Sequence, residues 1–325
     1  TVAQELGSME GKEIRIGSAA SAMWGMTTTV TSNGSVNSMH DSQTPLSGML
    51  QMLNMQINCW FGGVGVGFMN YYAFLIIAVF ISGLMVGRTP EFLGKKVEAR
   101  EMKIATMVVL MHPFLILVGT GLASWLAARN PELASGWLNN PSFHGLSEML
   151  YEYTSSAANN GSGFEGLSDN TPFWNITTGI VLIMGRYFPI VGQVAIAGLL
   201  AGKKFVPESA GTLKTDTATF SVMTFAVIII VAALSFFPAL ALGPIADYET
   251  QQKYFTVRQI PFTPELARLF REARPAEDDK EPHHVHGGGG DFRHAAPARV
   301  HSCDRRPVAG VVRLQFRCLR RSVSY

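Results

Sequence analysis

Two short polar segments of the sequence carry the same residues at the same spacing. In each, Asn-Gly-Ser is followed after eight residues by Thr-Pro, once from Asn33 to Pro45 and again from Asn160 to Pro172. Glycine tolerates the left-handed backbone of a tight turn. Main-chain carbonyl oxygens held in such a turn can replace the water around a monovalent cation. The two segments therefore predict a pair of related turns that coordinate a cation.

The surroundings of the two turns repeat as well. Each copy follows a short stretch of small and hydroxyl-bearing residues and precedes a long apolar run. The order of short helix, glycine-bearing turn and membrane helix is typical of cation selectivity filters. A single Asn-Gly-Ser is also an ordinary turn and a glycosylation sequon. Two copies at matched spacing favour the filter interpretation.

The composition predicts a membrane protein. Of the 325 residues, 47% are hydrophobic and 15% are charged, whereas soluble domains carry about 25% charged residues. The formal net charge is +2, and no basic stripe with interleaved aromatic residues precedes the tail. We therefore expect the lipid bilayer as a partner and no nucleic acid.

Four stretches are long and apolar enough to cross a bilayer, which takes about 20 residues. Two further stretches, residues 17–31 and 144–158, are too short or too polar, and we predict re-entrant pore helices there, each ending at its turn. The predicted fold is an all-α membrane protein of helix–pore helix–helix repeats, with about four transmembrane helices and two pore helices. The four spans are roughly residues 60–87, 104–128, 173–201 and 217–243.

The basic residues predict the orientation. The segments after the first and third spans are rich in lysine and arginine, whereas residues 129–170 contain only Arg129. Positive charge marks the cytoplasmic side, so both turns should face outside. The basic residues are Arg88, Lys95, Lys96, Arg100 and Lys103 in the first segment and Lys203, Lys204 and Lys214 in the second.

Fixed charges near the turns are few. Neither turn contains a carboxylate, and the C-terminus of each pore helix would supply about half a negative charge to favour a cation. The nearest acids, Asp41, Glu165 and Asp169, either raise the local cation concentration or lie on a solvated loop. His40 beside Asp41 has no third member of a hydrolase triad in the sequence.

Two features suggest an ion pathway beyond the turns. The run FGGVGVG contains Gly62, Gly63 and Gly65, which would either pack helices closely or break a helix that lines a cavity. Arg186 lies within the third span, where a charge is costly. It would either line the pathway or extend to the membrane interface.

At these residues the chain resembles the potassium-translocating subunit of the bacterial Kdp P-type ATPase, a family of four such repeats around one pore. The resemblance covers nearly all of residues 10–248. The matching stretches are SNGSVNSMHDSQTPL (32–46), FGGVGVG (61–67), GLMVGRTPEFLGKKVEAREMK (83–103), HGLSEMLYEYTSSAANNGSGFEGLSDNTPFWN (144–175) and FPALALGPIADY (237–248).

The resemblance implies potassium as the transported ion, a bacterial cytoplasmic membrane and partners in an ATP-hydrolysing subunit and small accessory subunits. No DKTGT phosphorylation motif occurs, so the chain itself is not expected to hydrolyse ATP. The alternative is a gradient-driven transporter of the Trk/Ktr type. The implied gate lies near Gly62, Gly63 and Gly65, and the implied filter residues are Ser32, Asn33, Gly34, Asn159, Asn160 and Gly161.

The resemblance also divides the chain. The family often has a glutamate about four residues before the FGGVG stretch, where Asn58 and its neighbours stand in this chain, so the chain departs from the family pattern there. The chain starts at Thr1, and we expect the first two repeats to precede it. We expect the tail to be disordered and to be the ATP-hydrolysing subunit read out of frame. The segments are residues 1–58 (end of the third repeat), 59–103 (interrupted helix and loop), 104–201 (fourth repeat), 202–248 (final helix) and 249–325 (tail).

Overall fold

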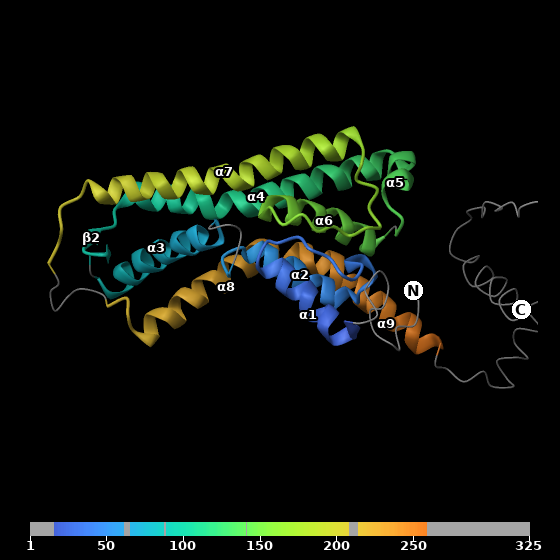
Figure 1. Ribbon diagram of the computed structural model, residues 1–325, viewed down its shortest axis with the longest axis horizontal. Coiled ribbons are helices and arrows are strands. Elements are labelled where there is room, and N and C mark those ends of the chain that lie inside the picture. The colour runs from blue at the N-terminus through green and yellow to red at the C-terminus, as the bar shows by residue number, and fades with distance from the viewer. Residues whose placement is uncertain (1–15, 62–65, 88, 141, 208–213, 259–325) are drawn as a thin grey trace, which may run out of the picture. The chain divides into compact units, whose positions relative to one another are not determined.

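The computed structural model describes residues 16–61, 66–87, 89–140, 142–207 and 214–258. Helices dominate this part of the chain (Figure 1). They are connected by two strands, a 3-10 turn at His40–Ser42 and a π turn at Ala241–Ile245. The helices are α1 (Gly17–Val30), α2 (Pro45–Ile57), α3 (Val66–Val86), α4 (Ala99–Arg129), α5 (Pro131–Trp137), α6 (Phe143–Ala158), α7 (Pro172–Ala201), α8 (Ala218–Leu240) and α9 (Ala246–Arg258).

Four helical segments are long and apolar enough to cross a membrane, which agrees with the predicted all-α membrane class. Large apolar side chains such as Ile183 and Leu234 are exposed along them, as expected where lipid is the solvent. The fourth segment joins α8, the π turn and α9 and is longer than predicted. The segments are Val66–Met85, Ala99–Arg129, Pro172–Ala201 and Ala218–Gln252.

The helix that follows the first turn is broken, whereas the helix that follows the second is continuous. α2 ends at Asn58, whose left-handed backbone (φ 45°) terminates the helix, and α3 begins at Val66. Hence the first span starts later than the predicted residue 60. α7, which also begins at a Thr-Pro pair, runs unbroken from Pro172 to Ala201.

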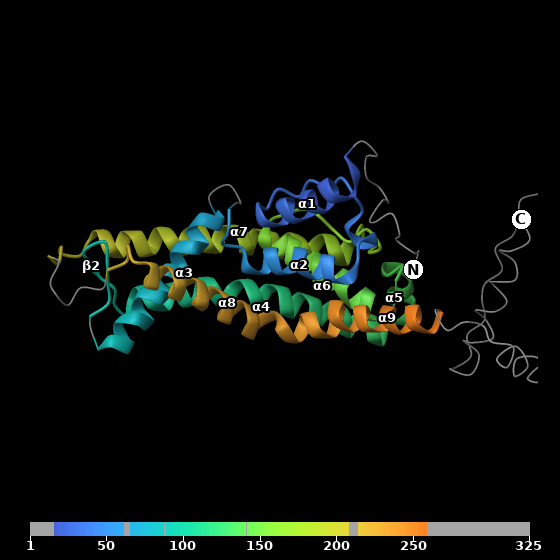
Figure 2. The same cartoon turned by 90° about the horizontal axis from the view of Figure 1, so that it is seen from below.

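The two short helices form over the ranges predicted for pore helices. α1 contacts α2, and α6 contacts α4 and α7 over part of their lengths (Figure 1); Figure 2 shows α1 above α2 and α6. Glycines allow this close approach: a Cβ on Gly119 would strike the Tyr153 ring, and one on Gly185 would strike the Ala157 carbonyl. The apolar core around α6 includes Leu150 and Trp174.

A small hairpin, which the sequence did not predict, lies in the first basic loop. Strands β1 (Glu91–Phe92) and β2 (Lys95–Lys96) pair antiparallel. Leu93 and Gly94 both have positive φ (49° and 68°), as a type I′ turn requires. Lys203, after α7, donates to the Lys96 carbonyl (2.8 Å). The two basic loops therefore meet, at the end of the α4–α7 pair away from α5 (Figure 1).

The chain remains helical beyond the point where we predicted the disordered tail to begin. α9 continues through Arg258, and its first turns are supported by side chains: Thr250 donates to the Ala246 carbonyl (2.8 Å) and Gln251 donates to Asp247 (3.3 Å). The expected disorder from residue 249 therefore does not hold for residues 249–258. The rest of the predicted tail lies outside the described residues.

Candidate cation site at two paired turns

The two predicted turns have the same backbone conformation. In the first, Ser32 and Gly34 have φ values of 52° and 80°; in the second, Asn159 and Gly161 have values of 55° and 98°. The asparagine between each pair is not in the left-handed region. Matched residues of the two copies therefore adopt positive φ at the same two positions.

An asparagine side chain closes each turn in the same way. The Oδ1 atom of Asn33 accepts from the Ser35 amide at 3.0 Å, and that of Asn160 accepts from the Ser162 amide at 3.1 Å. This is the local bond by which asparagine stabilises turns. It explains why Asn, Gly and Ser recur together in both copies.

The turns also contact each other. The Nδ2 atom of Asn160 donates to the carbonyl of Thr28, in the last turn of α1, at 2.7 Å. A Cβ on Gly34 would collide with the Asn160 carbonyl, so only glycine fits at this approach. The structure thus brings together the six predicted filter residues from two segments far apart in the sequence.

Each short helix ends directly at its turn. The Asn33 amide donates to the Thr28 carbonyl at 3.1 Å, and the Asn160 amide donates to the Ser155 carbonyl at 2.9 Å. The last carbonyls of α1 and α6 therefore lie beside the paired turns. The negative ends of both helix dipoles favour a cation there.

Arg186 lies against the second turn. Its Nε atom donates to Asn159 Oδ1 at 3.0 Å, and Asn159 Nδ2 donates to the Leu182 carbonyl at 3.2 Å. The sequence left open whether this arginine lines the pathway or extends to the interface. In the structure it anchors the end of α6 to α7.

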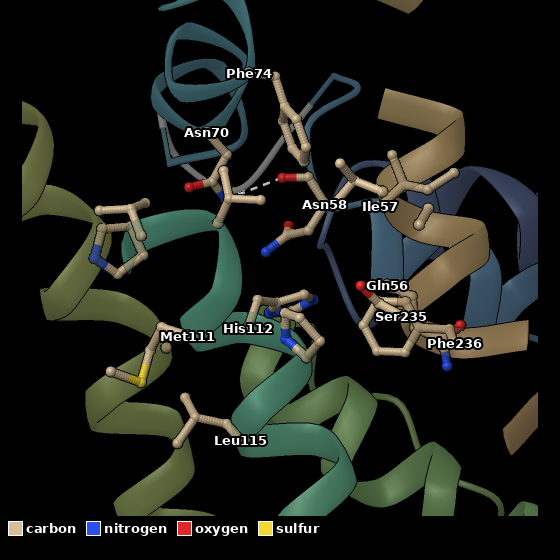
Figure 3. Close-up of a pocket in the computed structure, with 17 residues that line it drawn as sticks. Gln56, Ile57, Asn58, Asn70, Phe74, Met111, His112, Leu115, Ser235 and Phe236 are labelled. Atoms are coloured by element: carbon tan, nitrogen blue, oxygen red, sulfur yellow. Dashed lines mark hydrogen bonds between the residues drawn. The ribbon is translucent and has the colours of Figure 1, made fainter. Parts of the chain in front are cut away.

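The predicted gate residues Gly62, Gly63 and Gly65 lie outside the described residues. A cavity lies beside the point where this segment begins, among α2, α3, α4, α7 and α8 (Figure 3). Its wall is largely apolar, with Asn58 at one edge, where the Asn58 carbonyl accepts from Asn70 Nδ2 at 3.0 Å. Asn58 thus contributes an amide to the lining of this cavity and no charge.

A cluster of charged side chains, which the sequence did not reveal, lies beside the loops that follow the turns. His144, at the start of α6, lies 2.8 Å from Asp41 through Nε2 and 2.8 Å from Asp247 through Nδ1. Burial alone would lower the pKa of His144, but the hydrogen bonds and charges of Asp247 and Asp41 outweigh it and raise the pKa to about 10. An imidazolium therefore ties the first loop, α6 and α9 together.

Glu148 completes this cluster. Its Oε1 atom accepts from Asn140 at 2.9 Å, and burial raises the pKa of its carboxyl to about 7. Asp41, His144 and Glu148 offer ligand atoms within 4.8 Å of one another. Both ring nitrogens of His144, however, already bond to carboxylates, so the cluster forms an ion-paired link between elements.

His40 is a buried neutral residue. Burial lowers the pKa of His40 to about 4, and its Nδ1 atom lies 2.9 Å from the hydroxyl of Tyr151 on α6. Its ring thus bonds across to the second repeat. The pair is separated by 111 residues, and no spacing in the sequence could have connected them.

Comparison with known proteins identifies the family of the chain. Residues 1–248 match the family described as the potassium-transporting ATPase A subunit. The chain is 76% identical over 248 residues to the potassium-transporting ATPase potassium-binding subunit of Parabacteroides distasonis, and 75% identical over 250 residues to that of Phocaeicola vulgatus. Those matches cover 75% and 76% of this chain and 44% of each relative.

The likeness extends to more distant bacteria. The subunit of the same name from Geobacillus kaustophilus is 52% identical over 248 residues, covering 76% of this chain and 43% of that protein. The chain thus spans less than half the length of the curated relatives it matches. It belongs to the family of potassium-transporting ATPase A subunits.

Proposed function

We propose that the chain forms two walls of a potassium filter in an ATP-driven potassium importer. The observation that supports this most directly is the contact between the two turns: matched backbones meet where Gly34 lies against the Asn160 carbonyl. Carbonyl oxygens of Ser32, Asn33 and Gly34, with those of Asn159, Asn160 and Gly161, would replace the water of a dehydrated potassium ion.

Selection in this proposal depends on carbonyl dipoles and not on fixed charge. The ends of α1 and α6 add negative potential without a carboxylate in the turns. Potassium is the cargo, and no resident cofactor is needed. Asp169 is exposed at the second loop and would raise the cation concentration at the mouth, while Asp41 is engaged by His144.

The partner subunits and the membrane are inferred from the relatives. Their name assigns them to a potassium-transporting ATPase, so we infer that an ATP-hydrolysing subunit and small accessory subunits are the partners. The membrane would be the bacterial cytoplasmic membrane, with the turns facing outside. The Trk/Ktr alternative is disfavoured because the family match extends through residue 248, including the last span.

Gly161→Asp tests the filter assignment. Gly161 has a φ of +98° and no neighbouring atom within 4 Å of the position of a Cβ, so an aspartate would strain the turn and add a charge. In the full-length protein assembled into its complex, we expect potassium uptake at low external concentration to fall at least about tenfold, which corresponds to about 1.4 kcal/mol. Unchanged uptake in a well-expressed variant would contradict the assignment.

A further inference from the structure

The serine that follows each filter glycine bonds to an aromatic side chain of its own short helix. In the first repeat, Trp24 Nε1 donates to Ser35 Oγ at 3.0 Å; in the second, Tyr151 Oη lies 2.8 Å from Ser162 Oγ. In both repeats the aromatic residue precedes the serine by 11 residues. The two contacts therefore occupy equivalent positions.

The hydrogen atoms of the second contact can be assigned. The Oδ1 atom of Asn160 can only accept, so Ser162, at 2.6 Å, must donate to it. A hydroxyl has one hydrogen to donate, so Ser162 Oγ accepts from Tyr151. Tyr151 donates just as the Trp24 indole does.

His40 continues the chain of bonds. Because the Tyr151 hydrogen points to Ser162, the Tyr151 oxygen accepts from His40 Nδ1 at 2.9 Å. A neutral ring with hydrogen on Nδ1 satisfies this arrangement. The bonds run in one direction, from His40 through Tyr151 and Ser162 to Asn160, whose Nδ2 atom then donates to the Thr28 carbonyl.

The tyrosine is held in place by packing. Tyr151 and His40 are 0% and 1% exposed. The Tyr151 ring stacks on Phe164 with centroids 4.2 Å apart, and Phe164 in turn fills the space beside Gly48 of α2. The hydroxyl therefore meets Ser162 at a fixed position.

From these contacts we propose that Trp24, Tyr151 and His40 are positioning residues for ion selectivity: the two aromatic donors hold the serine behind each filter glycine, and His40 fixes Tyr151. This proposal rests on the filter assignment. A chain of bonds that polarise one another holds a site more rigidly than single contacts do, so in this proposal the loss of a bond changes how well the carbonyl oxygens fit potassium relative to the larger rubidium ion.

Tyr151→Phe tests the proposal, with Tyr153→Phe as the matched control. Tyr153 lies on the same helix, is 1% exposed, and bonds through its hydroxyl to Thr177 of α7 at 2.9 Å. Tyr151→Phe removes two hydroxyl bonds, with Ser162 and with His40, and Tyr153→Phe removes one, with Thr177, so Tyr151→Phe should cost more thermal stability. Only Tyr151→Phe should change the ratio of half-saturating potassium and rubidium concentrations in the assembled complex, by about threefold to tenfold.

Three further variants keep the test decisive if Tyr151→Phe assembles poorly. Trp24→Phe removes the indole donor from a side chain that is 43% exposed and should shift the same ratio. His40→Ala should shift it more than His40→Asn, which keeps a donor near the position of Nδ1. Equal ratios in all these variants and in Tyr153→Phe would overturn the proposal.

The filter assignment is tested separately in the same assay. If Gly161→Asp alters potassium uptake while Tyr151→Phe behaves like Tyr153→Phe, only the positioning role fails. If Gly161→Asp has no effect, the filter assignment itself fails.

Discussion

Among the single residues of the described chain, His144 is the side chain whose charge links three separate elements. It lies between Asp41 of the first loop and Asp247 of α9, and Glu148 of its own helix and Asn140 lie nearby. A cation shared by two partly buried carboxylates stabilises all three elements at once, because removing it would leave unpaired charges.

This arrangement predicts a pH dependence. The pKa of His144 is raised from 6.5 to about 10 in the folded protein, so its contribution to stability is complete below pH 6.5 and is lost as the pH rises through 10. Thermal unfolding in detergent should show that His144→Gln lowers the melting temperature at pH 7, by a few degrees, and that the difference from wild type shrinks towards pH 10.

The carboxyl group of Glu148 titrates in a different range. Glu148, with a pKa raised from 4.5 to about 7, opposes folding as the pH rises through that interval, below the range in which His144 loses its proton. A difference between wild type and His144→Gln that stayed constant from pH 7 to 10 would contradict the imidazolium assignment.

Among the helices, close contact places α6 beside the paired turns. A Cβ on Gly185 of α7 would strike the backbone of Ala157, in the last turn of α6, whereas one on Gly198 of the same helix meets no atom within 4 Å. Small residues let membrane helices approach in this way. The position of the second turn therefore depends on Gly185, which lies on the face of α7 that contacts α6.

These two glycines give a paired prediction. Gly185→Leu should destabilise the protein by about 1–3 kcal/mol through overpacking. Gly198→Leu should be neutral or slightly stabilising, because leucine has the higher helix propensity. Melting temperatures of the two variants in one detergent would measure this, and equal losses would show that the α6–α7 contact does not govern stability.

Across the molecule, the hairpin of the first basic loop lies at one end of the described helices, away from α1 and α6 (Figure 1). Lys203, in the second basic loop, donates to the Lys96 carbonyl of the first basic loop and lies 2.9 Å from the carboxylate of Glu101. These contacts bring the basic residues of the two loops close together. Positive charge stays on the cytoplasmic side. The orientation, with the turns outside, stays a prediction from the charges of the loops.

Cysteine labelling would test this orientation. In a background without native cysteines, Asn170→Cys, in the loop between the second turn and α7, should react with a membrane-impermeant maleimide in intact spheroplasts. Lys96→Cys, on the hairpin, should react only after permeabilisation. Both positions are exposed, so differences in labelling report the side of the membrane, and the reverse pattern would invert the proposed topology.

The membrane class, the short helices and the two turns could all be predicted from the order of the residues. These features depend on local rules: runs of about 20 apolar residues span a bilayer, glycine permits positive φ, and asparagine closes the turn on its own backbone. Each rule acts within a short stretch of chain, so composition and spacing were sufficient. The break at Asn58 was only partly visible, since the sequence predicted an interrupted helix within residues 59–103 but not the left-handed asparagine that ends α2.

Which residues meet across the fold could not be predicted in this way. The contacts of Asn160 with Thr28, of His40 with Tyr151 and of His144 with Asp41 join residues separated by 132, 111 and 103 positions. Such pairs follow from helix packing, which depends on the fit of many side chains and leaves no periodic signal in the sequence. The turns could be recognised one at a time, but their meeting as one site is a property of the folded chain.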